Sequence, residues 1–167
     1  EVEDTSQNGS SNKKCPMIIG ILEDISEEMQ TDARLNLLAQ IFTHSREGIT
    51  ITDADQNILE TNKAFEAITG YTSGEVAGKK PSILQSGLHD NEFYDKMWHD
   101  INEEGYWRGE IINRRKNGEE CPEILSISAV RDKAGDLTNY IGIFSDITEL
   151  KAKEKQLREI AYFDGLT

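Results

Sequence analysis

The alternation of apolar and polar residues predicts two groups of strands. In the first group, Gly48–Asp53 alternates isoleucine with threonine as a half-buried strand does, and Ile58–Thr61 follows a turn as its hairpin partner. In the second group, we expect strands over Tyr106–Arg115, Glu120–Asp132 and Leu137–Ser145. An Asn-Gly pair between the first two of these favours a tight hairpin.

Helices are predicted between the two groups by capping residues and by apolar residues at helical spacing. Asn62 can cap a short helix that Gly70 ends, and Thr72 with Glu75 has the form of a capping box for a second. Asp90 can cap the longest internal helix. The apolar face of that helix consists of Phe93, Met97, Trp98 and Ile101. This order predicts an α+β fold, a five-stranded antiparallel sheet with helices on one face.

The last strand is predicted to turn directly into an exit helix. The apolar residues of Asn139–Leu150 give way to polar ones at Asp146. Asp146 and Glu149 have the spacing of a capping box, in which each side chain bonds an amide of the new helix. Leu150–Tyr162 is charged and helical in pattern, so a linker helix is expected there.

The same strand–cap–helix pattern occurs earlier in the chain. Ile19–Glu27 and Ile141–Glu149 are identical at six of nine positions, with an offset of 122 residues. A repeat of this length favours two tandem domains. Ile18–Leu22 would then be the last strand of a preceding domain and Asp24–Ser45 its linker helix. The chain is expected to be a piece of a longer protein.

Both flanking helices carry apolar residues at helical spacing. On the first helix these are Leu35, Leu38, Ile41 and Phe42. On the exit helix they are Ile147, Leu150, Leu157 and Ala161, with Glu154 interrupting the heptad series. The first stripe would pack on the following domain, form a dimer seam, or do both. The second is either a weak dimer seam or one face of a solvated helix. We expect a homodimer.

Composition excludes several classes of function. A net charge of -13 argues against a nucleic-acid-binding surface, which needs clustered lysine and arginine. The longest apolar run, Met17–Leu22, is too short to span a bilayer, and no signal peptide is evident. The acidic charge is typical of a soluble cytosolic protein, so we expect a cytoplasmic protein. Cys15 and Cys121 match no metal spacing and are expected to be idle thiols. No catalytic or metal-binding constellation is evident, so this part of the chain is not expected to be an enzyme.

Four segments resemble a PAS domain. They are Gly48–Asp53, Asn62–Tyr71, Gly105–Gly118 and the Asp-Ile-Thr triplet Asp146–Thr148. The resemblance implies a sensory or dimerisation module over residues 35–149, with a five-stranded sheet that cups a ligand or a packed core. Residues 1–34 would be the tail of a preceding PAS-like domain and a linker helix.

The end of the chain carries a second resemblance. Ala161–Thr167 is similar to the opening of a GGDEF diguanylate cyclase domain. Residues 150–167 would then be the exit linker helix and the first residues of that domain, in a bacterial cyclic di-GMP signalling protein. The adjacent PAS and GGDEF domains would be partners within the same chain. Asp146, Ile147 and Thr148 are expected to relay the signal.

Two chemistries that PAS domains use fit this sequence poorly. Photoactive flavin domains that trap a cysteine adduct resemble the segment Gly78–Gln85, but Pro81 stands at the position of the reactive cysteine, so we reject that reading. Haem would need an axial imidazole, and His89 and His99 border the longest helix. A single histidine on a helix is more often a surface residue.

Two readings of the pocket stay open. Redox-sensing PAS domains that bind FAD without a covalent bond resemble this chain at Thr50, Trp98 and Asn113, which would offer a hydroxyl, a flat ring face and an amide. Some of those sensors have glutamate where this chain has Pro81. The broader reading is a domain with another small molecule, or with a filled core that only assembles partners.

Overall fold

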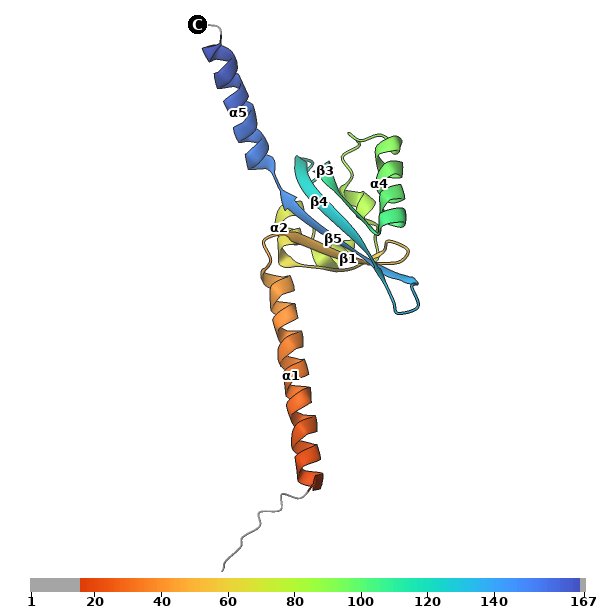
Figure 1. The fold of residues 1–167 in the computed structure, drawn as a ribbon. Coiled ribbons are helices and arrows are strands. Elements are labelled where there is room, and N and C mark those ends of the chain that lie inside the picture. Colours follow the sequence, from red (N-terminus) through yellow and green to blue (C-terminus); the bar gives the residue numbers. More distant parts are fainter. Residues whose placement is uncertain (1–15, 166–167) are drawn as a thin grey trace, which may run out of the picture. The chain divides into compact units, whose positions relative to one another are not determined.

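The computed structural model describes residues 16–165 and divides the chain into two units, Glu1–Gln40 and Ile41–Thr167. The described part of the first unit is helix α1, which spans Pro16–His44 and so ends just inside the second unit (Figure 1). The second unit holds the sheet and the remaining helices. Cys15 and the last two residues of the predicted GGDEF-like segment lie outside the described residues.

The predicted strand Ile18–Leu22 is wrong in this structure, because these residues lie inside α1. Every side chain from Met17 to Ile41 is exposed, and none of the strands among the described residues pairs with this segment. An unpaired strand would leave its backbone groups without partners, whereas a helix satisfies them within the segment. Phe42, in the second unit, is half-buried, whereas Leu35 and Leu38, in the first unit, are more than half exposed. The packing and dimer roles of this stripe stay predictions.

The second unit contains the predicted five-stranded antiparallel sheet, with strand order β2-β1-β5-β4-β3. The strands are β1 (Gly48–Asp53), β2 (Ile58–Thr61), β3 (Tyr106–Arg114), β4 (Glu120–Arg131) and β5 (Leu137–Asp146). The first two match their predicted bounds, and the others end within one residue of them. The long pairings of β3, β4 and β5 follow from short hairpin turns, of which the first contains Asn117 and Gly118 as predicted.

The inserted helices begin and end at the capping residues. They are α2 (Lys63–Thr69), α3 (Ser73–Val76), the 3-10 helix η1 (Pro81–Leu84) and α4 (Asn91–Glu104). Asn62 and Asp90 accept the amide hydrogens of Phe65 and Phe93, and the capping box of Thr72 and Glu75 is complete. The helix–sheet arrangement over residues 46–149 confirms the predicted α+β fold with helices on one face (Figure 1).

The core between the helices and the sheet consists of two clusters. One contains the buried residues Ile58, Phe65, Val76, Leu84 and Phe144, and the other contains Met97, Ile101 and Tyr140. Gly48 allows β1 to approach the first cluster closely, because a Cβ at that position would lie 2.3 Å from the Phe144 ring. The two clusters do not merge, and a cavity lies between them.

Candidate functional site

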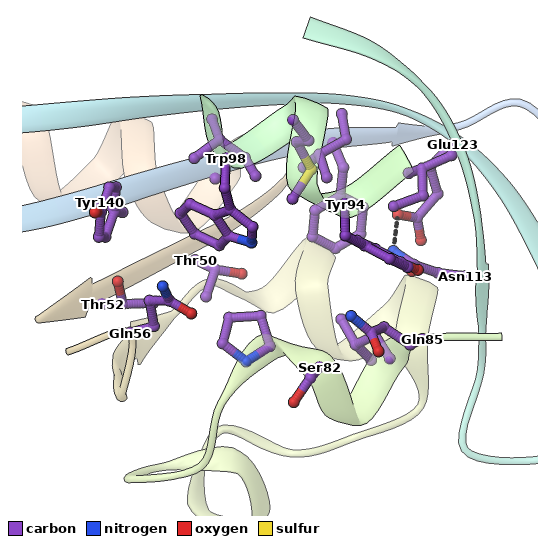
Figure 2. Close-up of a pocket in the computed structure, with 18 residues that line it drawn as sticks. Thr50, Thr52, Gln56, Ser82, Gln85, Tyr94, Trp98, Asn113, Glu123 and Tyr140 are labelled. Carbon is purple, nitrogen blue, oxygen red and sulfur yellow. Dashed lines mark hydrogen bonds between the residues drawn. The ribbon is translucent and has the colours of Figure 1, made fainter. Parts of the chain in front are cut away.

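The cavity lies between the inner face of the sheet and the helices α4 and η1 (Figure 2). Its volume is about 140 Å³. Its wall is mostly apolar, with Leu84 and Phe144 from one core cluster and Met97 and Tyr140 from the other. A concave apolar site with a few polar groups is the usual form of a small-molecule site.

The three residues predicted to bind a cofactor all line this cavity. Thr50 comes from β1, Trp98 from α4 and Asn113 from β3. Thr50 and Asn113 are buried, and the half-buried indole of Trp98 meets the ring of Tyr140 edge-on at 5.4 Å between centroids. Residues 63 positions apart in sequence thus face one space, as the resemblance implied. The structure places them together, and their binding role stays a prediction.

A buried acid on the same wall was not foreseen. Glu123 lies on β4 with 2% of its surface exposed, and its Oε2 accepts a hydrogen bond of 2.9 Å from Asn113 Nδ2 (Figure 2). Burial raises the pKa of Glu123 to about 7, although hydrogen bonds from Asn113 and the Cys121 thiol oppose the shift. The carboxyl group therefore titrates well above the ordinary range of a glutamate.

The missed residues could have been found only in part from the sequence. Glu123 is in phase with Cys121, Leu125 and Ile127, but both phases of β4 carry apolar residues, so alternation does not decide which face is buried. Tyr94 is a second omission. Its hydroxyl is buried with no hydrogen-bond partner, and burial raises its pKa. An orphaned hydroxyl on a cavity wall is suited to a polar ligand atom.

The two disfavoured chemistries find no support in the geometry. Pro81 lines the cavity at the position where a cysteine adduct would form. Cys121 is buried elsewhere on β4, and burial raises the pKa of its thiol to about 12, so the thiol is unreactive. Neither histidine lines the cavity. His99 is exposed, and His89 Nε2 accepts the Ile112 amide hydrogen at 2.8 Å.

The exit junction is continuous, as predicted, but its capping is different. β5 runs to Asp146, and helix α5 spans Thr148–Asp164 with Ile147 as its N-cap. The predicted capping box of Asp146 and Glu149 is wrong, because α5 starts one residue too late for Asp146 to be its cap. Asp146 Oδ1 instead accepts hydrogen bonds from the amide and hydroxyl of Thr148, at 2.8 and 2.5 Å.

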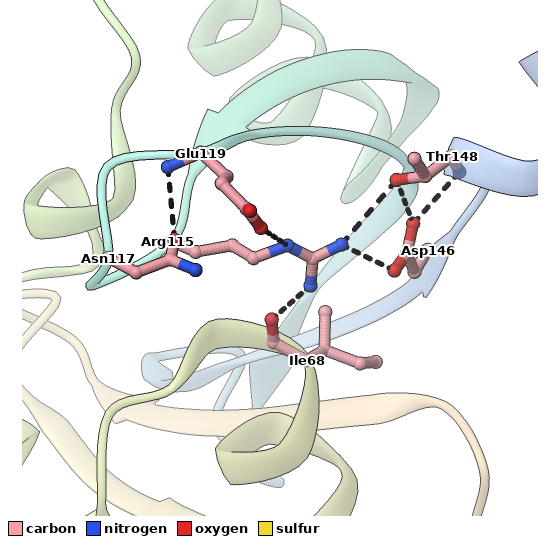
Figure 3. Close-up of polar contacts among 6 residues, drawn as sticks. All are labelled: Ile68, Arg115, Asn117, Glu119, Asp146 and Thr148. Carbon is pink, nitrogen blue, oxygen red and sulfur yellow. Dashed lines mark hydrogen bonds and ion pairs between the residues drawn. The ribbon is translucent and has the colours of Figure 1, made fainter.

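Arg115 explains why the Asp146 carboxylate turns back toward the domain. Its Nη2 forms an ion pair of 2.6 Å with Asp146 Oδ2, and its Nη1 donates to the Ile68 carbonyl at the end of α2 (Figure 3). Burial alone would raise the pKa of Asp146, but the hydrogen bonds from Arg115 and Thr148 hold it below its ordinary value. One guanidinium therefore joins the exit junction to a helix of the core.

The cavity wall and the exit junction share neighbouring residues of β4. Glu123 is paired with Asp146 across β4 and β5, and Cys121 contacts Glu123 through its thiol. The Ile147 amide donates to the carbonyl of Pro122 at 2.9 Å, and its side chain is buried. Glu123 and the start of α5 are thus connected through adjacent residues of β4 and β5.

Residues 16–165 contain neither a metal-binding cluster nor a membrane-spanning helix. No group of three or more histidine, cysteine or acidic residues there could hold a metal ion. No helix in the same range is long and apolar enough to cross a membrane.

Several known proteins have sequences related to this chain. The PAS domain family matches residues 46–149. The chain is 33% identical over 110 residues to the nitrogen fixation regulatory protein of Klebsiella oxytoca. This match covers 66% of this chain and 22% of that protein. It is 32% identical over 123 residues to the blue-light photoreceptor of Listeria innocua, covering 72% of this chain and 48% of that protein. The chain thus spans about a fifth of the first relative and about half of the second.

Solved structures agree with the fold. The crystal structure of the PAS domain of a protein from Colwellia psychrerythraea superposes with a TM-score of 0.65 at 23% identity. The match covers 69% of this chain and 98% of that one, so the likeness extends over a whole domain of the same architecture.

Proposed function

The chain belongs to the PAS family of sensory domains, and from this premise we propose that it senses a flat heteroaromatic ligand, in the first place a flavin such as FAD, or the redox state of that ligand. The signal would leave through α5 to a GGDEF diguanylate cyclase domain. The observation that carries the proposal is the cavity wall, on which a flat ring, two amides and an unpartnered hydroxyl face one space (Trp98, Asn113, Gln85 and Tyr94).

The size and opening of the cavity fit an aromatic ligand. A cavity of roughly 150 Å³ holds a benzene ring in another protein, and this one has about 140 Å³. Ser82 and Gln85 line the cavity while remaining exposed, so a ligand larger than one ring would reach the surface beside η1. A bound flavin would supply reversible redox chemistry and visible absorbance. Thr50, Trp98 and Asn113 would hold it by a hydroxyl, a ring face and an amide.

The name of one relative supports a light-absorbing ligand. One relative is named a blue-light photoreceptor, and such a protein must hold a pigment. In this chain Pro81 replaces the thiol that a covalent flavin adduct needs, so the proposal here is binding without a covalent bond.

The output side of the proposal rests on the junction. β5 passes into α5 with one residue between them, and Arg115 fixes the last residue of β5. α5 exposes the large apolar residues Leu150, Leu157 and Ile160, which suit a pairing helix in a homodimer. We propose a cytoplasmic bacterial protein in which adjacent PAS and GGDEF domains flank this one, and in which this domain is itself not an enzyme.

An absorption spectrum of the purified chain, with mass spectrometry of released small molecules, tests the ligand. We expect flavin bands and a released flavin. Trp98→Leu and Asn113→Leu should lower the flavin content severalfold, whereas His99→Ala, an exposed neighbour of Trp98 on α4, should leave it unchanged. A colourless wild-type protein that releases no small molecule would overturn the sensing proposal.

The alternative function is a ligand-free assembly module. The exposed apolar side chains on α1 and α5 favour it, since helices of this kind pair readily. A colourless chain that still dimerises, and that loses the dimer when Leu150 and Leu157 are replaced by glutamate, would establish this alternative.

A further inference from the structure

We propose that Glu123 makes ligand capture in the cavity proton-linked, because its carboxylate accepts a hydrogen bond from an imide-type N–H on the edge of a flat heteroaromatic ligand. The inference rests on the proposed function and deepens it. It assigns a ligand class to the site, namely rings that carry an N–H between two carbonyl groups. It also assigns Glu123 as the residue that selects for this class.

Glu123 is placed to receive such a donor. It is the one charged side chain among the described residues that line the cavity, and it is almost fully buried. Asn113 Nδ2 and the Cys121 thiol donate to it. A carboxylate has about four lone-pair sites, so two donors leave it able to accept a third from a ligand.

The rest of the wall suits the carbonyl groups that flank an imide N–H. The Tyr94 hydroxyl is buried without a partner, and Gln85 carries an amide donor. Asn113 has a second N–H beside the one given to Glu123. The cavity wall thus offers hydrogen-bond donors together with one strong acceptor, Glu123. This set matches a ring edge on which an N–H lies between two carbonyl groups.

The titration of Glu123 involves groups from each neighbouring element. These are Cys121 on β4, Arg115 in the turn between β3 and β4 and Asp146 at the end of β5. Tyr94 on α4 lines the same cavity, and the cavity-lining residues of η1 are uncharged. Burial raises the pKa of Glu123 to about 7, so the free cavity holds both protonation states near neutrality. The N–H of a ligand bonds to the ionised carboxylate of Glu123. At a pH below the pKa of Glu123, ligand binding therefore releases the proton that this carboxyl group holds.

Two ligands test the inference without any substitution. Lumiflavin carries the imide N–H, and 3-methyllumiflavin replaces that hydrogen with a methyl group. We would measure both dissociation constants on the full chain by quenching of ligand fluorescence, from about pH 5.5 to about pH 8.5. Lumiflavin should bind about tenfold more tightly for each pH unit up to about pH 7 and then level off. The methylated ligand should bind more weakly, with no such slope.

Two variants assign the slope to its residue. Glu123→Gln should remove the slope for lumiflavin, whereas Glu120→Gln, an exposed position on the same strand, should keep it. A slope that persists in Glu123→Gln, or that is the same for both ligands, overturns the inference while leaving the flavin site intact. Absence of lumiflavin binding to the wild-type chain at every pH overturns the flavin site and this inference with it.

Discussion

Two stretches of nearly the same sequence have different structures in this chain. Ile141–Glu149 forms the end of β5 and the start of α5, whereas Ile19–Glu27 lies wholly within α1. Six of the nine residues are identical. The aligned residues Phe144 and Leu22 differ most clearly in environment, since Phe144 is 4% exposed and Leu22 is 59% exposed.

The difference shows that the strand depends on its neighbours rather than on its own residues. The second stretch is paired on one side with β1 and on the other with β4, and Arg115 holds its last strand residue. The described first unit offers the earlier stretch no such partner, so it forms the structure that satisfies its backbone locally.

The largest expected difference between the stretches is in side-chain burial. Phe144→Ala should lower the free energy of unfolding by about 3–5 kcal/mol, because it empties a core position that meets Phe65 edge-on at 5.9 Å. Leu22→Ala, at the aligned exposed position, should change it by less than about 0.5 kcal/mol. Chemical denaturation of both variants measures this, and losses of similar size would show that the two stretches share one environment.

The second expected difference concerns pH, because only the later stretch lies beside a buried acid. The folded state holds the Glu123 proton to a higher pH than the unfolded chain does, so this contribution to stability is lost as the pH rises from 4.5 to about 7. The free energy of unfolding of Glu123→Gln should exceed that of the wild type by roughly 3 kcal/mol at alkaline pH. Under acidic conditions the two free energies should be almost equal. Denaturation curves across this pH range measure the gain, and a constant offset at all pH values would contradict the account.

The third expected difference is at the aligned aspartates. Asp146→Ala removes the partner of Arg115 and the acceptor of two Thr148 hydrogen bonds, and should cost about 0.5–2 kcal/mol. Asp24→Ala, in the middle of α1, should be neutral or slightly stabilising, since alanine favours helices. Thermal unfolding checks the pair. Equal effects would mean that the junction gains nothing from Asp146.

The smallest expected difference is at the aligned glycines. Gly20→Ala should stabilise α1 by roughly 0.5–1 kcal/mol, seen as added helical signal in circular dichroism, because nothing lies near the new Cβ. At Gly142 a Cβ would make ordinary contacts with Thr50 and Leu125 in the cavity, so Gly142→Ala should add no helix and should weaken lumiflavin binding. Unchanged helical signal in Gly20→Ala would argue against helix at the first stretch.

The sequence specified most of the fold because its signals there are local. Alternation set the strands, and the caps at Asn62, Thr72 and Asp90 set the starts of three helices. Where the outcome depended on distant partners, local patterns failed. The strand at Ile18–Leu22 needed neighbours that the described chain lacks. At Asp146 the local pattern predicted a box with Glu149, whereas one carboxylate oxygen bonds Thr148 and the other pairs with Arg115, which lies 31 positions away.

The candidate site was predictable to a similar degree. Thr50, Trp98 and Asn113 came from resemblance, and the fold brought them to one cavity. Glu123 could not be chosen in advance, because periodicity did not assign the buried face of β4. Tyr94 has the helical spacing of the apolar face that contains Met97, Trp98 and Ile101, so its burial was predictable, but the lack of a partner for its hydroxyl was not. Burial is also what raises the pKa of Glu123 into the range where it can respond to a ligand.

Hydrogen exchange at the exit junction tests most directly whether the cavity communicates with α5. The reporters are the amides of Ile147 and Thr148, which donate to Pro122 and Asp146. We predict that saturating lumiflavin changes exchange over residues 146–151 as well as in the cavity strands, and that Arg115→Met abolishes the change at the junction while leaving the strands protected. Protection confined to the cavity strands in the wild type would contradict the account.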